Sequence, residues 1–279
     1  MYPEIFKLGP VAIRSYGVML AFSFLLGILY VRHMSKNKSI DFDRLLTVAY
    51  ILIIGAIIGA RLSYVLFHLE EFSGNYLNAF NPFGSDQIGI AGLNLYGGII
   101  GAIICSFIYI RAKKMSVLET FDIFAPTIGV GLAFTRIGCF LNGCCFGTPT
   151  NLPWGVTFPE GSIPYYVFGS TALHPSQIYS SIYGIILFII LHQTLKHKRF
   201  RGEVVGLLFM IEAVFRFAIE YVRYYEDAMH IHFLGMNPTY NHLISISLFA
   251  LGLVIYLVQL QMHKSVYTEP NYDESTEDR

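Results

Sequence analysis

Residues 45–67 read LLTVAYILIIGAIIGARLSYVLF, a stretch of 23 residues in which Arg61 is the only charge. A helix needs about 20 predominantly apolar residues to cross the hydrocarbon core of a bilayer, so this stretch predicts a membrane-spanning helix. Stretches of the same kind lie at residues 13–32, 94–111, 121–142, 176–195, 203–222 and 240–261. We therefore expect an all-α integral membrane protein with seven transmembrane helices, in a single polytopic domain over residues 1–263.

The composition of the whole chain favours the same fold class. Hydrophobic residues make up 54% of the 279 residues, charged residues make up 14%, and the mean hydropathy is +0.53. Soluble domains carry about 25% charged residues. We expect membrane lipids as partners and no nucleic acid. The opening MYPEIFKLGP lacks the basic start and short apolar core of a cleavable signal peptide, so the first helix is expected to act as an uncleaved insertion signal.

The loops between the predicted helices alternate in charge. Three loops carry eleven basic residues, whereas loops 68–93, 143–175 and 223–239 contain Arg223 as their sole lysine or arginine. Basic loops stay in the cytoplasm, so we expect the N-terminus outside and the C-terminus inside. The acidic tail 264–279 is expected to be disordered in the cytoplasm. The eleven basic residues are Arg32, Lys36, Lys38, Arg44, Arg111, Lys113, Lys114, Lys196, Lys198, Arg199 and Arg201.

Charged side chains fall within or at the ends of the predicted spans, and four of them are Arg61, Arg136, Arg216 and Glu220. A charge at the bilayer centre costs at least ~2.5–3.5 kcal/mol, so such residues normally face a polar cavity or pair with one another. In the predicted topology all four lie in the outer halves of their helices. They are therefore expected to face the outer side of the membrane.

The helix predicted over 203–222 carries a charged stripe. Glu212, Arg216, Glu220 and Arg223 fall within an arc of about 80° at 100° per residue. Such a stripe either neutralises itself so that the bundle can fold, or forms a polar wall that holds arginines for an anionic ligand. Guanidinium groups bind phosphate well because their fork matches its oxygens and they do not deprotonate. The ligand that this placement favours is a phospholipid head group.

Three of the four cysteines lie in the stretch TRIGCFLNGCCFG, residues 135–147. A structural zinc site needs four ligands, usually in paired spacings, and Cys139, Cys144 and Cys145 do not provide them, so no metal is expected. A disulfide between Cys139 and one of its neighbours, or apolar packing, are the other readings. A nucleophilic cysteine remains possible, but no histidine lies near it in the sequence to activate it.

Three shorter motifs are weaker alone. SYG at 15–17 places Tyr16 at the start of a span, where it is either an interfacial tyrosine or part of a site. LYGGIIGA at 95–102 places Gly97 and Gly98 beside Tyr96, and close helix packing would explain these glycines. HPSQIY at 174–179 starts a predicted helix, so His174 either caps the helix or transfers a proton. The aromatic loops 68–93 and 143–175 are read as simple connectors or as short amphipathic elements at the interface.

These pieces together resemble the prolipoprotein diacylglyceryl transferase family. The resemblance runs from Ile13 to Gly252 and is carried by IRSYG, GARLSYVLF, YGGIIG, TRIGCFLNGCCFG, HPSQIY and FRFAIEYVR. It implies a bacterial inner-membrane enzyme with its active site toward the periplasm and no cofactor. It also implies that the diacylglyceryl group of phosphatidylglycerol is transferred to the lipobox cysteine of preprolipoproteins, with release of glycerol phosphate.

The resemblance also implies which residues form the site. Arg136 and Arg216 match the family's essential arginines, and Tyr16, Asn142, Gly147 and Glu220 match its supporting residues. The chain departs from the family pattern at Tyr96, Cys139, Cys144 and Ser180, where histidine, asparagine, glutamate and glutamate are usual. The base for the acceptor thiol is therefore open among Tyr96, His174 and Glu220. The remaining candidates for substrate binding are Arg61, Gly97, Gly98, Cys139, Gly143 and Arg223.

Two rival functions remain open. The first is a paralogue that keeps the lipid cavity and uses a different acceptor, because the replaced residues cluster near the expected chemistry. The second is a phospholipid-binding or transport protein without catalysis. A test of turnover with a lipobox peptide separates the three hypotheses.

Overall fold

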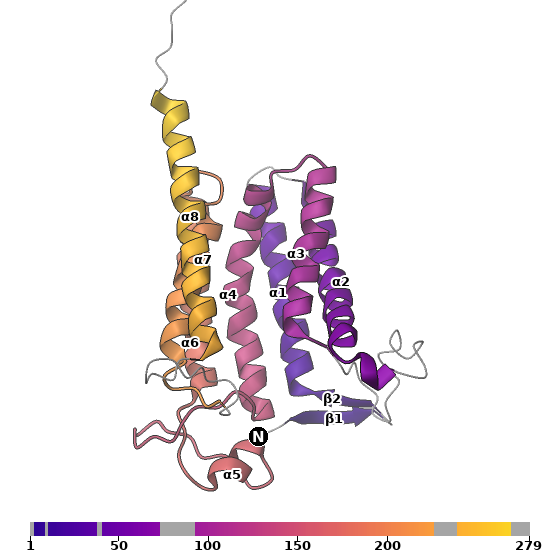
Figure 1. Cartoon of the computed structure of the whole chain (residues 1–279), viewed down its shortest axis with the longest axis vertical. Helices are drawn as coiled ribbons and strands as arrows, with labels where there is room; N and C mark the ends of the chain where they lie inside the picture. The colour runs from indigo at the N-terminus through magenta and orange to yellow at the C-terminus, as the bar shows by residue number, and fades with distance from the viewer. Residues whose placement is uncertain (1–2, 9–10, 38–40, 73–92, 226–238, 269–279) are drawn as a thin grey trace, which may run out of the picture.

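The structure is a computed structural model, and it describes residues 3–8, 11–37, 41–72, 93–225 and 239–268. In this part of the chain seven long helices run side by side (Figure 1). Each of the seven apolar stretches predicted from the sequence is helical. The helices are α1 (Ser15–Asn37), α2 (Phe42–Phe67), α3 (Leu95–Ala112), α4 (Val117–Asn142), α6 (Ser176–Lys196), α7 (Glu203–Ile219) and α8 (Tyr240–Thr268).

Six of these helices are long and apolar enough to cross a membrane, all except α7. The chain is therefore an α-helical, multi-pass membrane protein, as predicted. Helix α7 has 17 residues, or about 26 Å at 1.5 Å per residue, slightly less than a hydrocarbon core of about 30 Å. The sequence predicted this helix over 203–222, but it ends at Ile219 because the following residues turn away to pair with the loop after α4.

The helices alternate in direction, so the loops gather at two ends of the bundle (Figure 1). We call the end that holds the strands β1 (Glu4–Leu8) and β2 (Val11–Arg14) the hairpin end. The opposite end, which holds the connections 113–116 and 197–202, is called the short-loop end. Most of the basic residues counted above lie at or near the short-loop end, and Arg61, Arg136 and Arg216 lie toward the hairpin end.

The bundle is built from antiparallel contacts between neighbouring helices. Helix α4 packs between α1 and α6, α2 pairs with α3, and α7 pairs with α8. The buried core joins side chains of α1, α2, α4, α6 and α7. On the outer faces, apolar side chains such as Ile54, Ile108, Ile186 and Val254 are at least half exposed. A surface this apolar is unusual for a soluble protein and fits contact with lipid.

The hairpin end contains two strands that the sequence analysis did not predict, and short helices in the two aromatic loops, where short amphipathic elements were one of the two readings. Strands β1 and β2 pair in antiparallel register, η1 (Leu69–Phe72) follows α2, and α5 (Ile163–Phe168) lies in the loop after α4. That loop, 143–175, has its own small core of Phe146, Phe158 and Leu173. It is therefore a packed cap with one short helix, not a simple connector. Most of the other aromatic loop, residues 73–92, lies outside the described residues.

Helix α8 is longer than predicted. It continues to Thr268, five residues into the segment assigned to the acidic tail. Residues 269–279 of that tail lie outside the described residues.

Candidate active site

The C-terminus of α4 brings two cysteines together. Gly143 has φ 75°, in the left-handed region, and its N–H donates to the carbonyl of Phe140 at 3.3 Å. The N–H of Cys144 donates to the carbonyl of Cys139 at 3.1 Å. This pair of hydrogen bonds is the Schellman motif, in which the residue after the left-handed glycine folds back over the helix. The residues that meet in this way are Cys139 and Cys144.

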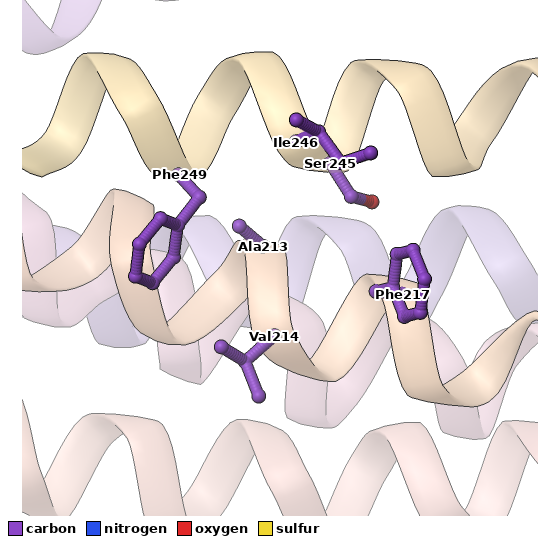
Figure 2. Close-up of a pocket in the computed structure, with 6 residues that line it drawn as sticks. All are labelled: Ala213, Val214, Phe217, Ser245, Ile246 and Phe249. Carbon is purple, nitrogen blue, oxygen red and sulfur yellow. The ribbon is translucent and has the colours of Figure 1, made fainter.

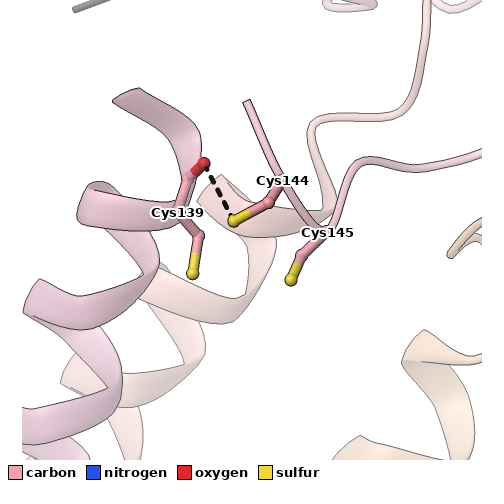
Figure 3. Close-up of side chains that lie close together, drawn as sticks. All are labelled: Cys139, Cys144 and Cys145. Atoms are coloured by element: carbon pink, nitrogen blue, oxygen red, sulfur yellow. Dashed lines mark hydrogen bonds between the residues drawn. The ribbon is translucent and has the colours of Figure 1, made fainter. Parts of the chain in front are cut away.

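Cys145 completes a cluster of three thiols. The Sγ atoms of Cys139, Cys144 and Cys145 all lie within 4.8 Å of one another, and all three thiols are free (Figure 3). Cys145 itself has φ 62°, which is uncommon for a residue other than glycine. The start of α6 holds this turn, because Ser176 Oγ donates to the carbonyl of Cys145 at 2.7 Å and Gln177 Nε2 to that of Cys144 at 2.8 Å.

The environment of Cys145 favours a thiolate. Hydrogen bonds from the thiols of Cys139 and Cys144, together with the positive charges of Arg223 and Arg136, lower the pKa of the Cys145 thiol. Burial acts in the opposite direction. Negative charge at this turn is therefore stabilised by its neighbours.

Arg136 lies on α4, one helical turn before Cys139. Its side chain is half-buried and makes no hydrogen bond or ion pair with any described residue. Tyr16, at the start of α1, packs against the same turn, since a Cβ on Gly138 would lie 3.1 Å from Tyr16 Cα. The charges of Arg136 and the three thiols all act on Tyr16. Tyr16, Arg136 and the thiols therefore form one cluster. In this cluster the guanidinium group of Arg136 has donors that no described residue uses.

Arg216 is held in a network centred on Glu220. Arg216 pairs with Glu220 Oε1 at 3.2 Å and donates to Tyr225 Oη at 3.1 Å, and Tyr225 donates to Glu220 Oε1 at 2.6 Å. The other carboxylate oxygen accepts from Thr239 at 2.8 Å and from Asn241 at 3.2 Å. Burial, and then the hydrogen bond to Glu220, raise the pKa of Tyr225 to about 12, so it stays a donor. The self-neutralising reading of the stripe is thus correct for this pair.

Glu212 connects this network to Arg136. It accepts a hydrogen bond from Tyr183 at 2.9 Å, and the charges of both Arg216 and Arg136 act on it. The charges of the two arginines therefore both act on one carboxylate.

Arg223 does not lie on the helical stripe, contrary to the prediction. It follows the end of α7 and forms an antiparallel bridge with Gly147. Its guanidinium carbon lies 5.2 Å from the ring centroid of Tyr225, and its Nε is buried with no hydrogen-bond partner in the described part of the chain. An unsatisfied buried donor costs free energy, so this nitrogen is available to donate a hydrogen bond to a ligand. Gly147 is required here, since a Cβ would lie 2.5–2.6 Å from atoms of His174 and Val222.

Comparison with known proteins agrees with these features. The sequence model described as prolipoprotein diacylglyceryl transferase matches residues 3–258. The chain belongs to the prolipoprotein diacylglyceryl transferase family. A relative from Pasteurella multocida, named phosphatidylglycerol–prolipoprotein diacylglyceryl transferase, is 31% identical over 266 residues, which cover 93% of this chain and 92% of the relative.

Relatives of the same name come from other bacteria. The protein from Clostridium tetani is 34% identical over 224 residues, covering 80% of this chain and 86% of the relative. The protein from Thermotoga maritima is 33% identical over 222 residues, covering 78% and 73%. The resemblance stated from the motifs is therefore confirmed over nearly the whole chain.

Other candidate residues of this family member lie beside the cluster. Asn142, half-buried at the end of α4, hydrogen-bonds to the Cys144 thiol. The carbonyl of His174 accepts from the N–H of Gly147 at 3.1 Å, and its Nδ1 lies 3.3 Å from Tyr179 Oη. Helix α6 has no side-chain cap, so the capping reading of His174 is wrong.

Four of the residues predicted for the site lie on α2 and α3, a pair of helices that packs beside α1 and α4. Arg61 lies over the rings of Tyr64 and Phe72. Tyr96 is 56% exposed in the first turn of α3. Gly97 and Gly98 pack against α2, and a Cβ on Gly97 would lie 2.1 Å from Ser63 Cβ. Close helix packing explains both glycines.

A pocket of about 250 Å³ lies between α7 and α8 (Figure 2). Its lining is apolar apart from Ser245, and it occupies a different face of α7 from Glu212 and Arg216. Such a pocket fits an acyl chain and not a phosphate. It is lined by Ala213, Val214, Phe217, Ser245, Ile246 and Phe249.

Sequence reasoning missed two parts of the site. Tyr225 and Thr239 bind Glu220 from outside the predicted spans, Asn241 binds it from the first turn of α8, and no periodic pattern marks these three residues. The approach of Cys139 and Cys144 could have been predicted, because a glycine after a helix indicates a Schellman contact between the residue that follows it and the residue four positions before it.

Proposed function

We propose that this chain transfers the diacylglyceryl group of phosphatidylglycerol to the cysteine thiol of a prolipoprotein, with release of glycerol phosphate. Membership of the family and the names of the relatives support this activity. The structural observation that carries it is Arg136, a half-buried guanidinium group without a partner among the described residues, together with the buried Nε of Arg223, which has no hydrogen-bond partner there either. Free guanidinium donors of this kind match a phosphodiester.

In this proposal Arg136 and Arg223 hold the phosphate, and Arg216 supports it from its network with Glu220. The reaction breaks the bond between glycerol carbon and phosphate oxygen, so negative charge grows on the leaving phosphate. Guanidinium groups already fixed around that oxygen stabilise the transition state more than the ground state. Tyr16 and Asn142 line the same cluster and would orient the head group and the acceptor.

The apolar pocket between α7 and α8 supports a place for an acyl chain. It opens on the surface of the bundle that would face lipid, and α7 also carries Arg216 toward the hairpin end. A phospholipid could therefore keep its tails among the helices while its phosphate reaches the arginines.

The proposal includes an orientation in the bacterial inner membrane. All seven helices cross, the hairpin end faces the periplasm, and the basic short-loop end faces the cytoplasm. An epitope tag placed before Met1 should then be accessible to antibody in intact spheroplasts. A tag placed after Arg279 should need permeabilisation. The reverse pattern would refute the orientation.

A reconstituted assay tests the activity. The full chain in detergent is mixed with phosphatidylglycerol and a lipobox peptide, and mass spectrometry follows the peptide while glycerol phosphate is measured. The expected product is a thioether-linked diacylglyceryl group on cysteine, which is lost with a peptide carrying serine instead. Transfer to a different acceptor would favour the paralogue, and lipid binding without turnover would favour a binding or transport protein. Either result would overturn the proposal.

A further inference from the structure

The proposed reaction needs a thiolate from the acceptor. A free cysteine has a pKa of about 8.5, so most of it is protonated near neutral pH. Glu212, on which the charge of Arg136 acts, accepts from Tyr183, and Glu220 accepts from three side chains and pairs with Arg216, so both carboxylates are engaged. What the described residues do place beside Arg136 is the cluster of three thiols.

The backbone holds these thiols in a way that packing alone does not require. The Schellman turn at Gly143 sets Cys144 over Cys139, and Cys145 takes a left-handed conformation at φ 62° that glycine would adopt with less strain. The three sulfur atoms lie within 4.8 Å of one another, and the close-up shows them gathered at the end of α4 (Figure 3). A strained residue whose thiol completes a cluster points to a ligand.

We propose that Cys139, Cys144 and Cys145 bind one Zn²⁺ ion, and that the open fourth position of this ion takes the acceptor thiol. This inference rests on the proposed function and extends it, because it gives the acceptor a means of activation. The spacing of the cysteines in the sequence had argued against a metal, since it lacks a second pair of ligands. The folded chain changes this conclusion by bringing the three sulfurs together.

The chemistry of the cluster fits zinc. Thiolates are soft ligands that favour zinc or monovalent copper over magnesium or calcium. Structural zinc sites are closed by four protein ligands, whereas catalytic sites have three and leave one position open. Sulfur atoms around tetrahedral zinc lie about 3.8 Å apart at a Zn–S distance of ~2.3 Å, so small side-chain rotations suffice. Cys144 and Cys145 are half-buried, not sealed, so an acceptor can reach the fourth position.

The charges around the cluster fit as well. Three protein thiolates and the acceptor thiolate around Zn²⁺ carry a net charge of −2. Arg136 lies one helical turn before Cys139 on α4, and Arg223 forms an antiparallel bridge with Gly147, two residues after Cys145, so two guanidinium groups near the cluster offset this charge. The same two arginines are the proposed phosphate ligands, so the metal would hold the nucleophile next to the phosphate of the lipid.

In the proposed step the acceptor thiol is deprotonated and replaces the phosphate on the glycerol carbon. Zinc deprotonates a coordinating thiol, and its proton leaves to solvent. The sulfur lone pair then attacks the glycerol carbon that carries the phosphate. A C–S bond forms, the C–O bond breaks, and the electron pair stays on the oxygen of the departing glycerol phosphate. The product is a thioether, a poor zinc ligand, so it leaves the metal for the next acceptor.

Metal content gives the first test. We purify the full chain from cells supplied with zinc and measure bound metal by plasma mass spectrometry. Wild type should hold about one zinc per chain, and Cys139→Ser, Cys144→Ser and Cys145→Ser should each retain less than a tenth of it. Cys105→Ser is the matched control, because Cys105 is exposed on α3 away from the cluster. Wild type that contains no zinc and takes up none would overturn the inference.

Cobalt gives the second test and does not depend on whether the variants fold. Co²⁺ replacing zinc in wild type should show sulfur-to-cobalt charge transfer and the strong visible bands of a tetrahedral site. Adding a lipobox peptide should change these bands, and the same peptide with serine should not. An unchanged spectrum with a peptide that is nevertheless turned over would refute activation at the metal.

Turnover separates failure of this inference from failure of the proposed function. A zinc chelator should lower the rate on the order of 100-fold, and added Zn²⁺ should restore it. If metal-free protein still forms the thioether and the chelator does not slow it, the proposed transferase activity is supported and the zinc site is refuted. If the protein binds the metal but transfers no diacylglyceryl group to the thiol, the proposed function on which this inference rests is refuted.

Discussion

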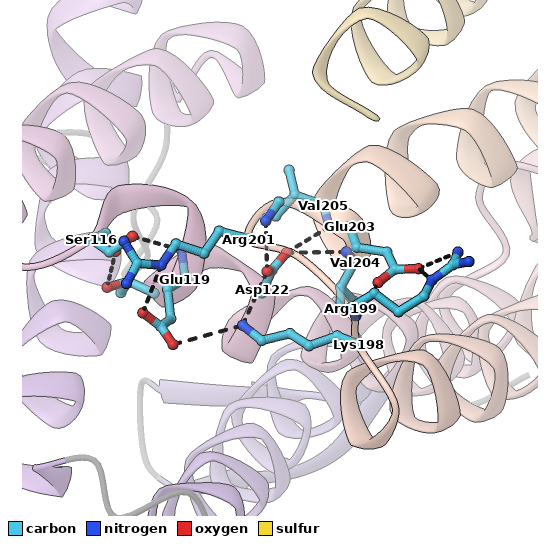
Figure 4. A network of polar contacts seen from close by, with 11 residues as sticks. Ser116, Glu119, Asp122, Lys198, Arg199, Arg201, Glu203, Val204 and Val205 are labelled. Atoms are coloured by element: carbon cyan, nitrogen blue, oxygen red, sulfur yellow. Dashed lines mark hydrogen bonds and ion pairs between the residues drawn. The ribbon is translucent and has the colours of Figure 1, made fainter. Parts of the chain in front are cut away.

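The two ends of the bundle treat buried charge in opposite ways. At the short-loop end the carboxylate of Asp122 is fully buried and has four partners (Figure 4). It accepts from the N–H groups of Gly202, Val204 and Val205 at 2.8–3.1 Å, and Lys198 Nζ lies at 3.3 Å. A carboxylate on α4 thus caps the N-terminus of α7, where unpaired N–H groups and the helix dipole favour negative charge.

At the hairpin end Arg216 and Glu220 pair with each other, but two other arginines are left incomplete. Arg136 has no partner among the described residues, and the Nε of Arg223 is buried without one. A buried donor left unsatisfied costs about 1–3 kcal/mol. The contrast indicates that one end is optimised for stability, whereas the other gives up stability to keep donors available. A substitution at the short-loop end should therefore harm folding, and one at the hairpin end should harm turnover.

Arg136→Ala should show the largest effect. Removing one preorganised donor from a developing oxyanion costs about 100- to 1,000-fold in rate, and Arg136 has no hydrogen bond or ion pair to a described residue that the substitution would break. We expect kcat for the lipobox peptide to fall by at least this factor, with little change in the thermal unfolding temperature in detergent.

Arg201→Ala is its matched control at the opposite end. Arg201 is exposed and pairs with Glu119 at 3.6 Å, so both kcat and stability should stay close to wild type. An Arg136→Ala protein that folds and keeps wild-type turnover would end the assignment of this residue.

Among these substitutions, Asp122→Ala should cause the largest loss of stability. It removes three caps from α7 and leaves Lys198 without its closest partner, and breaking a buried ion pair costs about 3–5 kcal/mol. We expect a clear fall in the unfolding temperature, while the folded fraction keeps the wild-type KM for phosphatidylglycerol. Asp43→Ala, at an exposed position on α2, should change little. A change in KM at full stability would show that the two ends are not separate in function.

The sequence predicted the helices well because each span is a local signal. Apolar length and the alternation of basic loops are written in consecutive residues, and all seven helices are present. What could not be predicted depends on contacts between distant segments. Asp122 caps a helix that starts 81 residues later, and Arg223 leaves the stripe because the chain pairs with Gly147. No helical period contains this information.

The candidate site divides along the same line. The shared surroundings of Arg136 and Arg216 followed from their positions in the outer halves of two spans. The partners of Glu220 did not, since Tyr225 and Thr239 lie in irregular segments. The thiol cluster is only partly predictable. Its turn is a local feature of the sequence, but the short distances between its sulfur atoms depend on how the chain folds back after α4.

Glu220→Gln should have an intermediate effect. It tests whether a residue at the hairpin end contributes to both stability and turnover. The substitution removes the negative charge that pairs with Arg216 and replaces one acceptor oxygen by a donor. Hydrogen bonds to charged groups contribute about 1.5–3 kcal/mol, so we expect a loss of about 2 kcal/mol in stability. Because Arg216 is then no longer held, kcat should also fall, on the order of 10-fold.

The measurements are thermal unfolding together with kcat and KM for phosphatidylglycerol. Tyr225→Phe is the control, since it removes the hydrogen bonds of the Tyr225 hydroxyl with Glu220 and Arg216 and keeps the ion pair between those two residues. It should show less than half of the kcat effect. Equal losses in the two variants would mean that the hydrogen-bond geometry matters and the charge does not.

Gly143→Ala should give the smallest effect, and it has a close internal control. Gly143 has φ 75° and Gly161 has φ 81°, so alanine at either position costs about 1 kcal/mol or slightly more from the left-handed backbone alone. A Cβ on Gly161 would meet nothing within 4 Å, and this residue lies in the cap, away from the thiols. Both variants should thus lose a similar amount of stability.

Only Gly143→Ala should disturb the thiol cluster, because only Gly143 sets the turn that folds Cys144 over Cys139. In a Cys105→Ser background, a bifunctional bimane that becomes fluorescent on linking two neighbouring thiols should react fast with wild type and with Gly161→Ala. It should react several-fold more slowly with Gly143→Ala. Equal reaction in all three proteins would mean that the thiols approach one another without the Schellman turn, and the local account of the cluster would then be wrong.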